Sequence, residues 1–439
     1  MIEASNGVVE RMCTLNVRGT KRGWQYLAIL VAVWAPVNAP AQQSSTQSLT
    51  WEQIREKFLA TNPTLQAARI GIEESHAQET TAYLRPNPDF TAGIDQIDPF
   101  PADPYRPFTN LFPYAIFDYL HERGHKRELR LESAKKGTVV AQSQLEDQQR
   151  NLLFNLRSAF VQTLQAKAVL ALAKENLDYY DKTLQVSRDR KQAGDIAQVD
   201  LDRLELQRVQ YESDLQTALV NLRTSKIQLL QLLNDRSPVE NFDVTGPYEF
   251  AENIVPLDEL RKTAIEARPD LKAAVQSVDK AKTDYHLAVA NGSTDPTFGV
   301  DFGRNPPISV YFGVSMSIPL RIFDRNQGEK ARTELDIKRN ERLRSAAEAQ
   351  VFSDVDSAYA TVNGNLILLR SYKSHYLAQA VRVRETISFA YQHGGASLLD
   401  FLQAQQDYRT TQLNYLNLIG SYLTAAGQLN LAVGREVIQ

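Results

Sequence analysis

The chain contains one pattern written twice, and this internal repeat constrains its fold more than any other feature. Residues 62–93 and 268–299 both begin with x-Pro-x-Leu-x-Ala-Ala and both end near Pro-x-Phe. Residues 190–201 and 390–401 also match, with Gln, Gly and Asp at equal spacing. Such a repeat predicts one elongated architecture with two related halves of about 200 residues, rather than several unrelated domains. We assign repeat 1 to residues 42–250 and repeat 2 to residues 251–439.

Long helical patterns dominate both repeats. Apolar, small and hydroxyl residues recur at alternating spacings of three and four, for example at Leu152, Leu156, Ala159, Thr163, Ala166 and Leu170. This spacing is typical of a coiled-coil seam, and its small residues indicate close packing of several helices. Each repeat is expected to contain a short helix, a long helix and a return helix, at residues 51–85, 126–193 and 196–234 and at residues 257–291, 328–392 and 398–433. At 1.5 Å per residue each long helix would span roughly 100 Å, about the summed length of its two shorter neighbours.

The pattern changes from helical to alternating between the first short helix and the long helix of each repeat. In repeat 2 an apolar residue stands at every second position, at Val310, Phe312, Val314, Met316 and Ile318. This alternation predicts an amphipathic strand. We expect one β-hairpin at about residues 89–120 and a second at about residues 297–318.

Two hairpins supply four strands, each near the roughly nine to eleven residues that cross a bilayer. Four strands do not close, and in lipid an open edge leaves backbone groups without hydrogen-bond partners. A membrane barrel would therefore need further copies, and about three chains would supply enough strands for a water-filled bore. The alternative is a pair of soluble hairpins packed on a helical bundle, and the alternation alone leaves both readings open.

The amino end has the features of a secretory signal peptide at residues 1–41. Basic residues precede the apolar run 27–35, and Ala39-Pro40-Ala41 forms a small-x-small cleavage site. A membrane anchor is the alternative, but the run is short of the roughly 20 residues that span a bilayer. The long segment before the run leaves both Met1 and Met12 open as the start.

Composition excludes several other classes of protein. The formal net charge of -3, with 23% charged residues, indicates neither a nucleic-acid-binding protein nor a disordered acidic chain. The one cysteine, Cys13, precedes the apolar run, so the exported chain would have no disulfide, no cysteine metal ligand and no lipid on cysteine. No phosphate-binding loop or Ser-His-Asp order stands out. We expect no catalytic residue, no cofactor and no metal site.

Residues 121–125, His-Glu-Arg-Gly-His, match H-E-x-x-H, the zinc-binding pattern of many peptidases. The metzincin extension would need Gly and His where Glu128 and Leu131 stand. The charged residues that follow belong to the start of the long helix. We therefore interpret the stretch as the boundary between a strand and a helix. A zinc peptidase using His121 and His125 is one rival function, and a secreted structural coiled coil is another, although it would not explain the hairpins.

Several segments together resemble a known family. They are the paired starts at residues 62–68 and 268–274, "GHKRELRLESA" at residues 124–134, and "YQHGGASLLDFLQAQQDYRTTQLNYLNLIGSYLTAAGQLNLAVG" at residues 391–434. These segments resemble the TolC-like outer-membrane efflux proteins, and the likeness runs from about Leu49 to Gly434. The segment "GGASLLDFLQAQ" is most similar to the branch that serves heavy-metal and drug pumps of the resistance-nodulation-division class.

The resemblance implies a mainly α fold with a small β part. It implies a homotrimer with a 12-stranded outer-membrane β-barrel, four strands per chain, continued by a long coiled-coil helical barrel in the periplasm. Such a channel passively conducts drugs or metal ions from an inner-membrane resistance-nodulation-division pump and a periplasmic adaptor (membrane fusion) protein to the exterior. The implied partners are this pump, this adaptor and outer-membrane lipid, with no nucleic acid. Whether the exported substrate is a metal or a drug is not readable from the chain.

The resemblance also implies roles for the turns between the long and return helices, which form the periplasmic tips. The candidates for contact with the adaptor are Ala193, Gly194, Asp195, Gly394, Gly395, Ala396 and Ser397. Glycine suits a sharp helix reversal because it tolerates positive φ. The alternative is that these residues only cap helices.

Two aspartates lie one turn into the return helices, Asp200 and Asp400. In a trimer each would repeat three times around the narrow periplasmic entrance, where carboxylates attract cations and can gate it. Asp400 matches an aspartate of the family's second tip, and Gln403 stands where a second acid would follow. Alternatively, Asp200 with Asp202 and Arg203 forms ordinary solvated helix pairs.

Overall fold

The computed structural model describes residues 47–97, 99–100, 103–104, 106–108, 110–305 and 308–438. All of them belong to one compact unit, Ser45–Gln439. The signal peptide predicted at residues 1–41, both candidate start positions and part of each hairpin loop lie outside the described residues.

The described chain is mainly helical, as the sequence predicts. The first half contains α1 (Trp51–Thr61), α2 (Pro63–Tyr83), α3 (Lys126–Ala193) and α4 (Gln198–Leu232). The second half contains α5 (Leu257–Ala267), α6 (Pro269–Asn291), α7 (Gln327–Ser371), α8 (Leu377–Gln392) and α9 (Leu398–Val433). Within the described residues, no helix combines the length and apolar character needed to cross a membrane.

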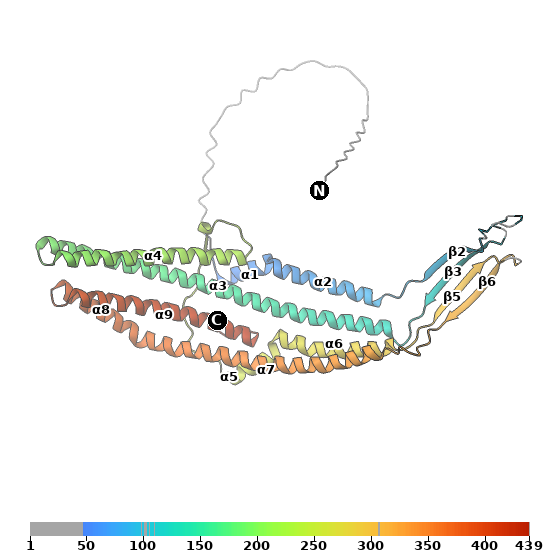
Figure 1. Cartoon of the computed structure of the whole chain (residues 1–439). Coiled ribbons are helices and arrows are strands. Elements are labelled where there is room, and N and C mark those ends of the chain that lie inside the picture. The colour runs from blue at the N-terminus through green and yellow to red at the C-terminus, as the bar shows by residue number, and fades with distance from the viewer. Residues whose placement is uncertain are drawn as a thin grey trace, which may run out of the picture. The chain divides into compact units, whose positions relative to one another are not determined.

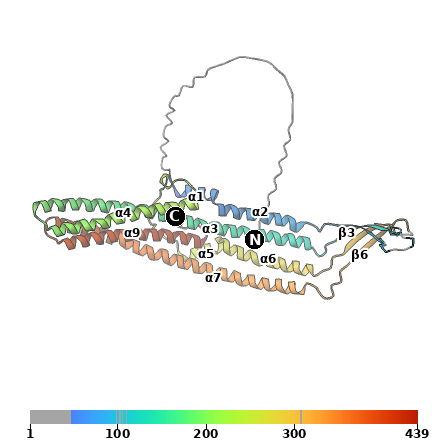
Figure 2. The ribbon, with the colours of Figure 1, turned by 45° about the horizontal axis from the view of Figure 1, so that its top comes forward.

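The longest helix, α3, has 68 residues and is therefore roughly 100 Å long. Figures 1 and 2 show α2 beside its first part and α4 beside its second part, while α7 is accompanied first by α6 and then by α9. α3 also contacts α6 and α9, so it joins the two halves. The sheet lies at one end of these helices, and the turns α3–α4 and α8–α9 lie at the other (Figure 1).

Each expected short helix is in fact two helices, and the break falls before a proline. Asn62 and Arg268 have extended backbones, with ψ of 118° and 123°. A following proline disfavours helical geometry at the residue before it, but is itself well suited to the first position of the next helix. Asn62 also caps α2, because its Oδ1 accepts a hydrogen bond from the Leu65 amide at 3.1 Å. The expected continuous helices at residues 51–85 and 257–291 were wrong in this respect.

The second long helix, expected without interruption at residues 328–392, is divided by a π-helical turn, Tyr372–Tyr376. From Val351 to Leu369 the buried residues of α7 follow spacings of three and four, and the next buried residue is Arg384. This interval is one residue longer than two heptads. A π turn takes up one extra residue, and it thereby keeps both ends of the helix facing α9.

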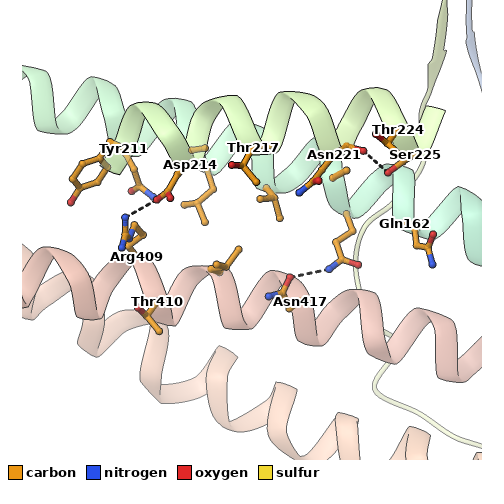
Figure 3. A pocket seen from close by; sticks show the side chains of 18 of the residues that line it. Gln162, Tyr211, Asp214, Thr217, Asn221, Thr224, Ser225, Arg409, Thr410 and Asn417 are labelled. Atoms are coloured by element: carbon orange, nitrogen blue, oxygen red, sulfur yellow. Dashed lines mark hydrogen bonds and ion pairs between the residues drawn. The ribbon is translucent and has the colours of Figure 1, made fainter. Parts of the chain in front are cut away.

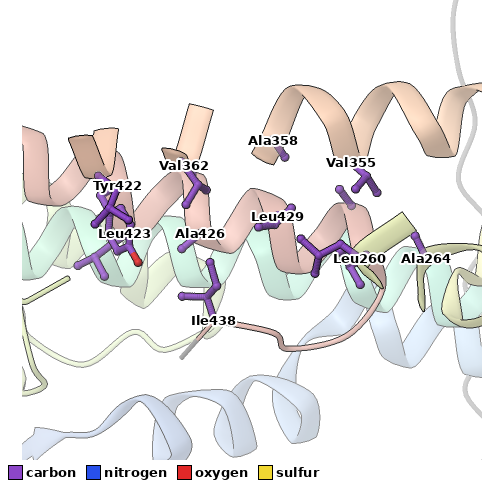
Figure 4. Packing of buried hydrophobic residues seen from close by; sticks show 14 of the residues in the cluster. Leu260, Ala264, Val355, Ala358, Val362, Tyr422, Leu423, Ala426, Leu429 and Ile438 are labelled. Atoms are coloured by element: carbon purple, nitrogen blue, oxygen red, sulfur yellow. The ribbon is translucent and has the colours of Figure 1, made fainter. Parts of the chain in front are cut away.

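The largest core cluster lies between α5, α7 and α9 (Figure 4). Val355, Ala358 and Val362 of α7 pack against Tyr422, Ala426 and Leu429 of α9. Alanine at the contact lets the helix axes approach closely, which accounts for the mixed seam read from the sequence.

Four strands form one antiparallel sheet in the order β2-β3-β5-β6. Their bounds are β2 Asp89–Asp95, β3 Phe112–Leu120, β5 Thr297–Gly303 and β6 Tyr311–Ser317. Three of the strands have 7 residues and β3 has 9, so most are shorter than expected. The sequence analysis also missed a short parallel pair, β1 (Gln47–Leu49) with β4 (Phe242–Val244), whose Phe242 and Val244 enter a second core cluster.

Candidate functional site

One face of the four-stranded sheet is apolar apart from the hydroxyl of Tyr119, which pairs with Phe298. Directly paired residues of neighbouring strands lie on the same face, and Phe117, Val300 and Val314 form one such row. The same face carries Phe90, Ala92, Ile94, Pro113, Ala115, Phe298, Phe302, Phe312 and Met316. Its large side chains are exposed, and Val314 has 74% of its surface accessible. A continuous exposed apolar face of this kind is what a lipid-facing sheet requires.

The opposite face is mainly polar and acidic, with Ile116 and Leu120 of β3 among its apolar residues. It carries Asp89, Asp95, Asp118 and Asp301, and the four strands contain no lysine or arginine. Two glycines make room for these carboxylates. A Cβ at Gly299 would lie 2.5 Å from Asp118 Oδ1, and a Cβ at Gly313 would lie 2.5 Å from Asp301 Oδ1. Toward the loop end of the strands the same face carries three rings: Phe112 stacks on Tyr114 at 5.6 Å and on Tyr311 at 5.8 Å between ring centres. This face therefore combines carboxylates and small polar groups with a small aromatic cluster.

Residues 121–125 do not form a zinc site of the H-E-x-x-H type. That pattern needs both histidines one turn apart on a helix, but β3 ends at Leu120, His125 has a left-handed backbone with φ of 56°, and α3 begins only at Lys126. Glu122 forms an ion pair with Arg130, with 2.9 Å between Oε2 and Nη2. No cluster of three or more metal-ligating side chains occurs among the residues described. The stretch is the turn between strand and helix, as interpreted from the sequence.

This turn is held by a buried ion pair. Lys126 is only 4% exposed, and its Nζ lies 2.6 Å from Asp295 Oδ2 and 2.9 Å from the Ser293 carbonyl oxygen. The Arg123 amide donates to Asp295 Oδ1 at 2.9 Å. Burial acts to raise the pKa of Asp295, but the hydrogen bonds from Lys126 and Arg123, with the Lys126 charge, outweigh it and hold the pKa below its usual value. The pair fixes the start of α3 to the segment that enters β5.

The first helical tip lies between α3 and α4. Gly194 has φ of 88°, and the Asp195 amide donates to the Arg190 carbonyl at 2.9 Å, so the glycine ends α3 in the usual left-handed manner. Ala193, Gly194 and Asp195 are exposed. Asp200 is partly exposed in the first turn of α4. Burial raises the pKa of Tyr391 in α8, and the charge of Asp200 acts in the same direction.

The second tip, between α8 and α9, has the same construction with a stronger cap. Gly394 has φ of 77°, and the Gly395 amide donates to the Ala390 carbonyl at 2.7 Å. Ser397 and Asp400 form a capping box: the Asp400 amide donates to Ser397 Oγ at 3.1 Å, and Asp400 Oδ2 accepts from the Ser397 hydroxyl at 2.7 Å. These hydrogen bonds from the Ser397 side chain and backbone lower the pKa of Asp400. Asp400 is thus both a cap and an exposed, ionised carboxylate.

A further acid that the sequence analysis missed lies on the same face of α9. Gln403 is exposed and donates to Asp407 Oδ1 at 2.8 Å. Asp400, Gln403 and Asp407 are spaced by three and four residues, so they share one face of the helix. The sequence signal was this spacing.

The two tips are joined by an aromatic cluster. Tyr180 stacks on Tyr211 at 4.5 Å between ring centres, and Tyr391 stacks on Phe401 at 4.9 Å. These rings belong to one buried cluster, and Arg190 Nη1 donates to the Tyr391 carbonyl at 2.9 Å. The structure therefore brings the predicted tip residues of both halves to one end of the helices.

Above the tips, a groove lies between α4 and α9 with α3 as its floor (Figure 3). Its volume is about 670 Å³. Two contacts cross it: Arg409 Nη1 lies 2.6 Å from Asp214 Oδ2, and Gln165 donates to Asn417 at 2.9 Å. Amides and hydroxyls line most of the remainder, including Asn221, Thr224 and Ser225. Apolar side chains of α3 and α9, among them Val169, Leu172 and Leu413, line the rest, so the seam between the two return helices has a mixed polar and apolar lining.

The capping box makes a testable contribution to the second tip. Ser397→Ala removes the side-chain acceptor of the Asp400 amide and is expected to cost about 1 kcal/mol locally. Hydrogen exchange of the first amides of α9 should then become about fivefold faster. Ser345→Ala is the matched control, because the exposed Ser345 hydroxyl only donates to the Glu341 carbonyl within α7. Equal exchange in the two variants would contradict the role of the cap.

Comparisons with known proteins agree with this architecture. The family model described as "Outer membrane efflux protein" matches residues 260–435. The cobalt-zinc-cadmium resistance protein CzcC of Cupriavidus metallidurans is 24% identical to this chain over 93% of the chain and 98% of its own length. The chain thus matches the outer membrane efflux protein family over residues 260–435. It is therefore a protein of the Gram-negative outer membrane that extends into the periplasm.

Other members of the family match over nearly the same extent. The outer membrane efflux protein BepC of Brucella suis is 21% identical over 90% of this chain and 87% of its own. A crystal structure of CusC, described in connection with transmembrane channel formation, superposes with a TM-score of 0.75 over 89% of this chain and 95% of that one, at 16% identity. The fold of this chain is thus that of CusC.

Proposed function

We propose that this protein is the outer-membrane exit channel of a tripartite efflux system. The observation that carries the proposal is the sheet with one apolar and one acidic, polar face at one end of the long helices. The apolar face suits lipid, and the polar face suits a water-filled conduit. The helices extend the conduit away from the membrane toward the tips.

The proposed assembly is a homotrimer. Within the described strands, β2 and β6 each pair with a neighbour on one side only. Lipid requires that such edges be closed, and pairing β6 of one copy with β2 of the next would close them. Three copies of the four-stranded sheet give a barrel of about twelve strands, which is wide enough for water and solutes.

The proposed partners follow from the two ends of the molecule. Outer-membrane lipid surrounds the sheet. The tips, with exposed Ala193, Gly194, Asp195, Gly394 and Gly395, would contact a periplasmic adaptor protein that links the channel to an inner-membrane resistance-nodulation-division pump. Ala396 and Ser397 complete this contact surface.

We further propose that Asp200 and Asp400 line the periplasmic entrance, with Gln403 beside them and Asp407 supplying the second carboxylate of α9. In a trimer these groups would form acidic rings at the narrow end. Asp400→Asn keeps an oxygen that can accept the Ser397 hydrogen bonds but removes the charge. It should reduce the preference of the conductance for cations over anions, measured as a reversal potential in a salt gradient. An unchanged reversal potential would contradict this role.

Metal ions or drugs are the proposed substrates, and the acidic face favours cations among them. The relative CzcC is named for resistance to cobalt, zinc and cadmium, which supports the metal branch.

The division into a signal peptide at residues 1–41 and two repeats at residues 42–250 and 251–439 remains part of the proposal. The similar order of helices and strands in the two halves supports the two repeats.

The assembly is tested by electrophoresis of outer-membrane fractions. The expected result is a band that migrates as a trimer of the 49.4 kDa chain, less its signal peptide, and that dissociates to the monomer only on boiling. Recovery of the chain solely as a soluble monomer would overturn the proposal and would favour the structural coiled coil.

A further inference from the structure

A buried arginine lies where the two halves meet near the tips. Arg384 of α8 is 8% exposed. Its guanidinium lies 4.5 Å from the ring centre of Tyr179 in α3 and 3.6 Å from that of Tyr408 in α9. Arg384 is therefore held between aromatic rings of two other helices, two turns before Tyr391 at the tip.

The charge of Arg384 has no carboxylate partner within ion-pair distance in the described part of the chain, and its Nε has no hydrogen-bond partner there. Burial raises the pKa of Tyr408, the charge of Arg384 lowers it, and the charge of Glu175 raises it. The carboxylate of Glu175 is therefore in the vicinity, but Glu175 is exposed. The two rings are thus the main compensation for the lost hydration of the guanidinium. A buried charge compensated in this way is only marginally stable in its site.

The surroundings tie the same three helices together at this level. The Tyr179 hydroxyl donates to Ser388 Oγ at 3.0 Å, and Gln405 Nε2 donates to the same oxygen at 3.1 Å. Ser388 is one turn beyond Arg384 on α8. If α8 and α9 moved away from α3, Arg384 would leave its rings and regain water. Such a movement would exchange the buried, aromatic surroundings of Arg384 for an aqueous environment.

We propose that Arg384 is a positioning residue that sets the balance between a narrow and a widened entrance. Contacts with the rings of Tyr179 and Tyr408 stabilise the narrow arrangement. In the widened arrangement the guanidinium regains its hydration, and this gain favours widening. This inference rests on the proposed function, because it treats the tips as the channel entrance. A neutral side chain at the same place would keep the helices together without that opposing preference.

The proposal predicts shifts of opposite sign. Arg384→Met keeps the length of the side chain and removes the charge, so the narrow state gains and the open fraction should fall several-fold. Tyr408→Leu removes one ring and leaves the charge buried, so the open fraction should rise about tenfold, as expected for the loss of a desolvated cation–π contact. Tyr179→Leu should act in the same direction as Tyr408→Leu. The double variant Arg384→Met with Tyr408→Leu should lie close to the single Arg384→Met variant, because the ring then has no cation to hold.

The measurement is the open fraction of single channels formed by the purified full chain in planar lipid bilayers. A purely structural role would shift all variants in one direction, as loosened packing, and would overturn the proposal. So would conducting channels whose open fraction is unchanged in every variant. If the unaltered chain forms a stable trimer but never conducts, the proposed function fails and this inference fails with it. If every variant conducts with the open fraction of the unaltered chain, the inference fails but the proposed function stands.

Discussion

Lys126→Met is expected to lower the free energy of unfolding by about 3 kcal/mol, because it leaves the Asp295 carboxylate in a largely buried site without its cation. The methionine also cannot donate to the Ser293 carbonyl. The loss should appear as a lower midpoint in urea, followed by far-UV circular dichroism of the purified chain. Asp295→Asn should cost less, because an amide keeps the acceptor for the Arg123 amide.

Lys182→Met is the matched control. Lys182 and Asp178 also lie 2.6 Å apart, but their side chains are 74% and 67% exposed, and such surface pairs contribute at most about 1 kcal/mol. Equal losses in the two lysine variants would show that burial of the Lys126 pair has no special importance.

The pH dependence of the same pair has a definite sign. The folded-state pKa of Asp295 is below its usual value, so the unfolded state binds the proton more readily than the folded state. The stabilisation is therefore complete above the ordinary aspartate pKa of about 4 and is lost as the pH falls through the folded value. Lys126→Met should remove this part of the acid dependence. An identical acid slope in the variant would contradict the assignment.

Val314→Arg is expected to abolish assembly in the outer membrane. Val314 lies on the apolar face of β6, where an arginine at mid-membrane depth costs about 2–4 kcal/mol per copy. In a trimer the cost applies to each of the three copies. The expected result is loss of the heat-resistant trimer from outer-membrane fractions, with the chain recovered elsewhere or degraded.

Ser315→Arg is the control one residue away. Ser315 lies on the polar face beside Gly299 and Asp118, where the arginine meets water and a carboxylate. It should assemble normally and change only conduction. Assembly of Val314→Arg as well as Ser315→Arg would show that the apolar face does not meet lipid.

The helical rods were predictable because their signals are local and repeated many times. The seam of three and four spacings extends from Leu152 to Leu184, and the structure places the helix that contains it at Lys126–Ala193, the range expected for it. The strands of the second hairpin followed from strict alternation about Val314. The tip reversals followed from Gly194 and Gly394, whose positive φ values explain why glycine stands there.

Other features depend on which helices meet, and no local pattern contains that information. The π turn at Tyr372–Tyr376 takes up one extra residue, so that the buried residues of α7 and of α8 both face α9. In the sequence Arg384 has the features of an ordinary surface arginine. Its contacts with Tyr179 and Tyr408 arise only because α3, α8 and α9 pack together. Lys126 and Asp295 are far apart in the chain, so their pairing follows only from the strand order.

The central claim is that the protein forms a water-filled channel, and conductance of the purified chain in a planar lipid bilayer tests it most directly. The account predicts discrete current steps that scale with salt concentration and prefer cations, from protein that migrates as a trimer. A correctly folded helical chain that inserts no conducting unit, or that remains a soluble monomer, would contradict it.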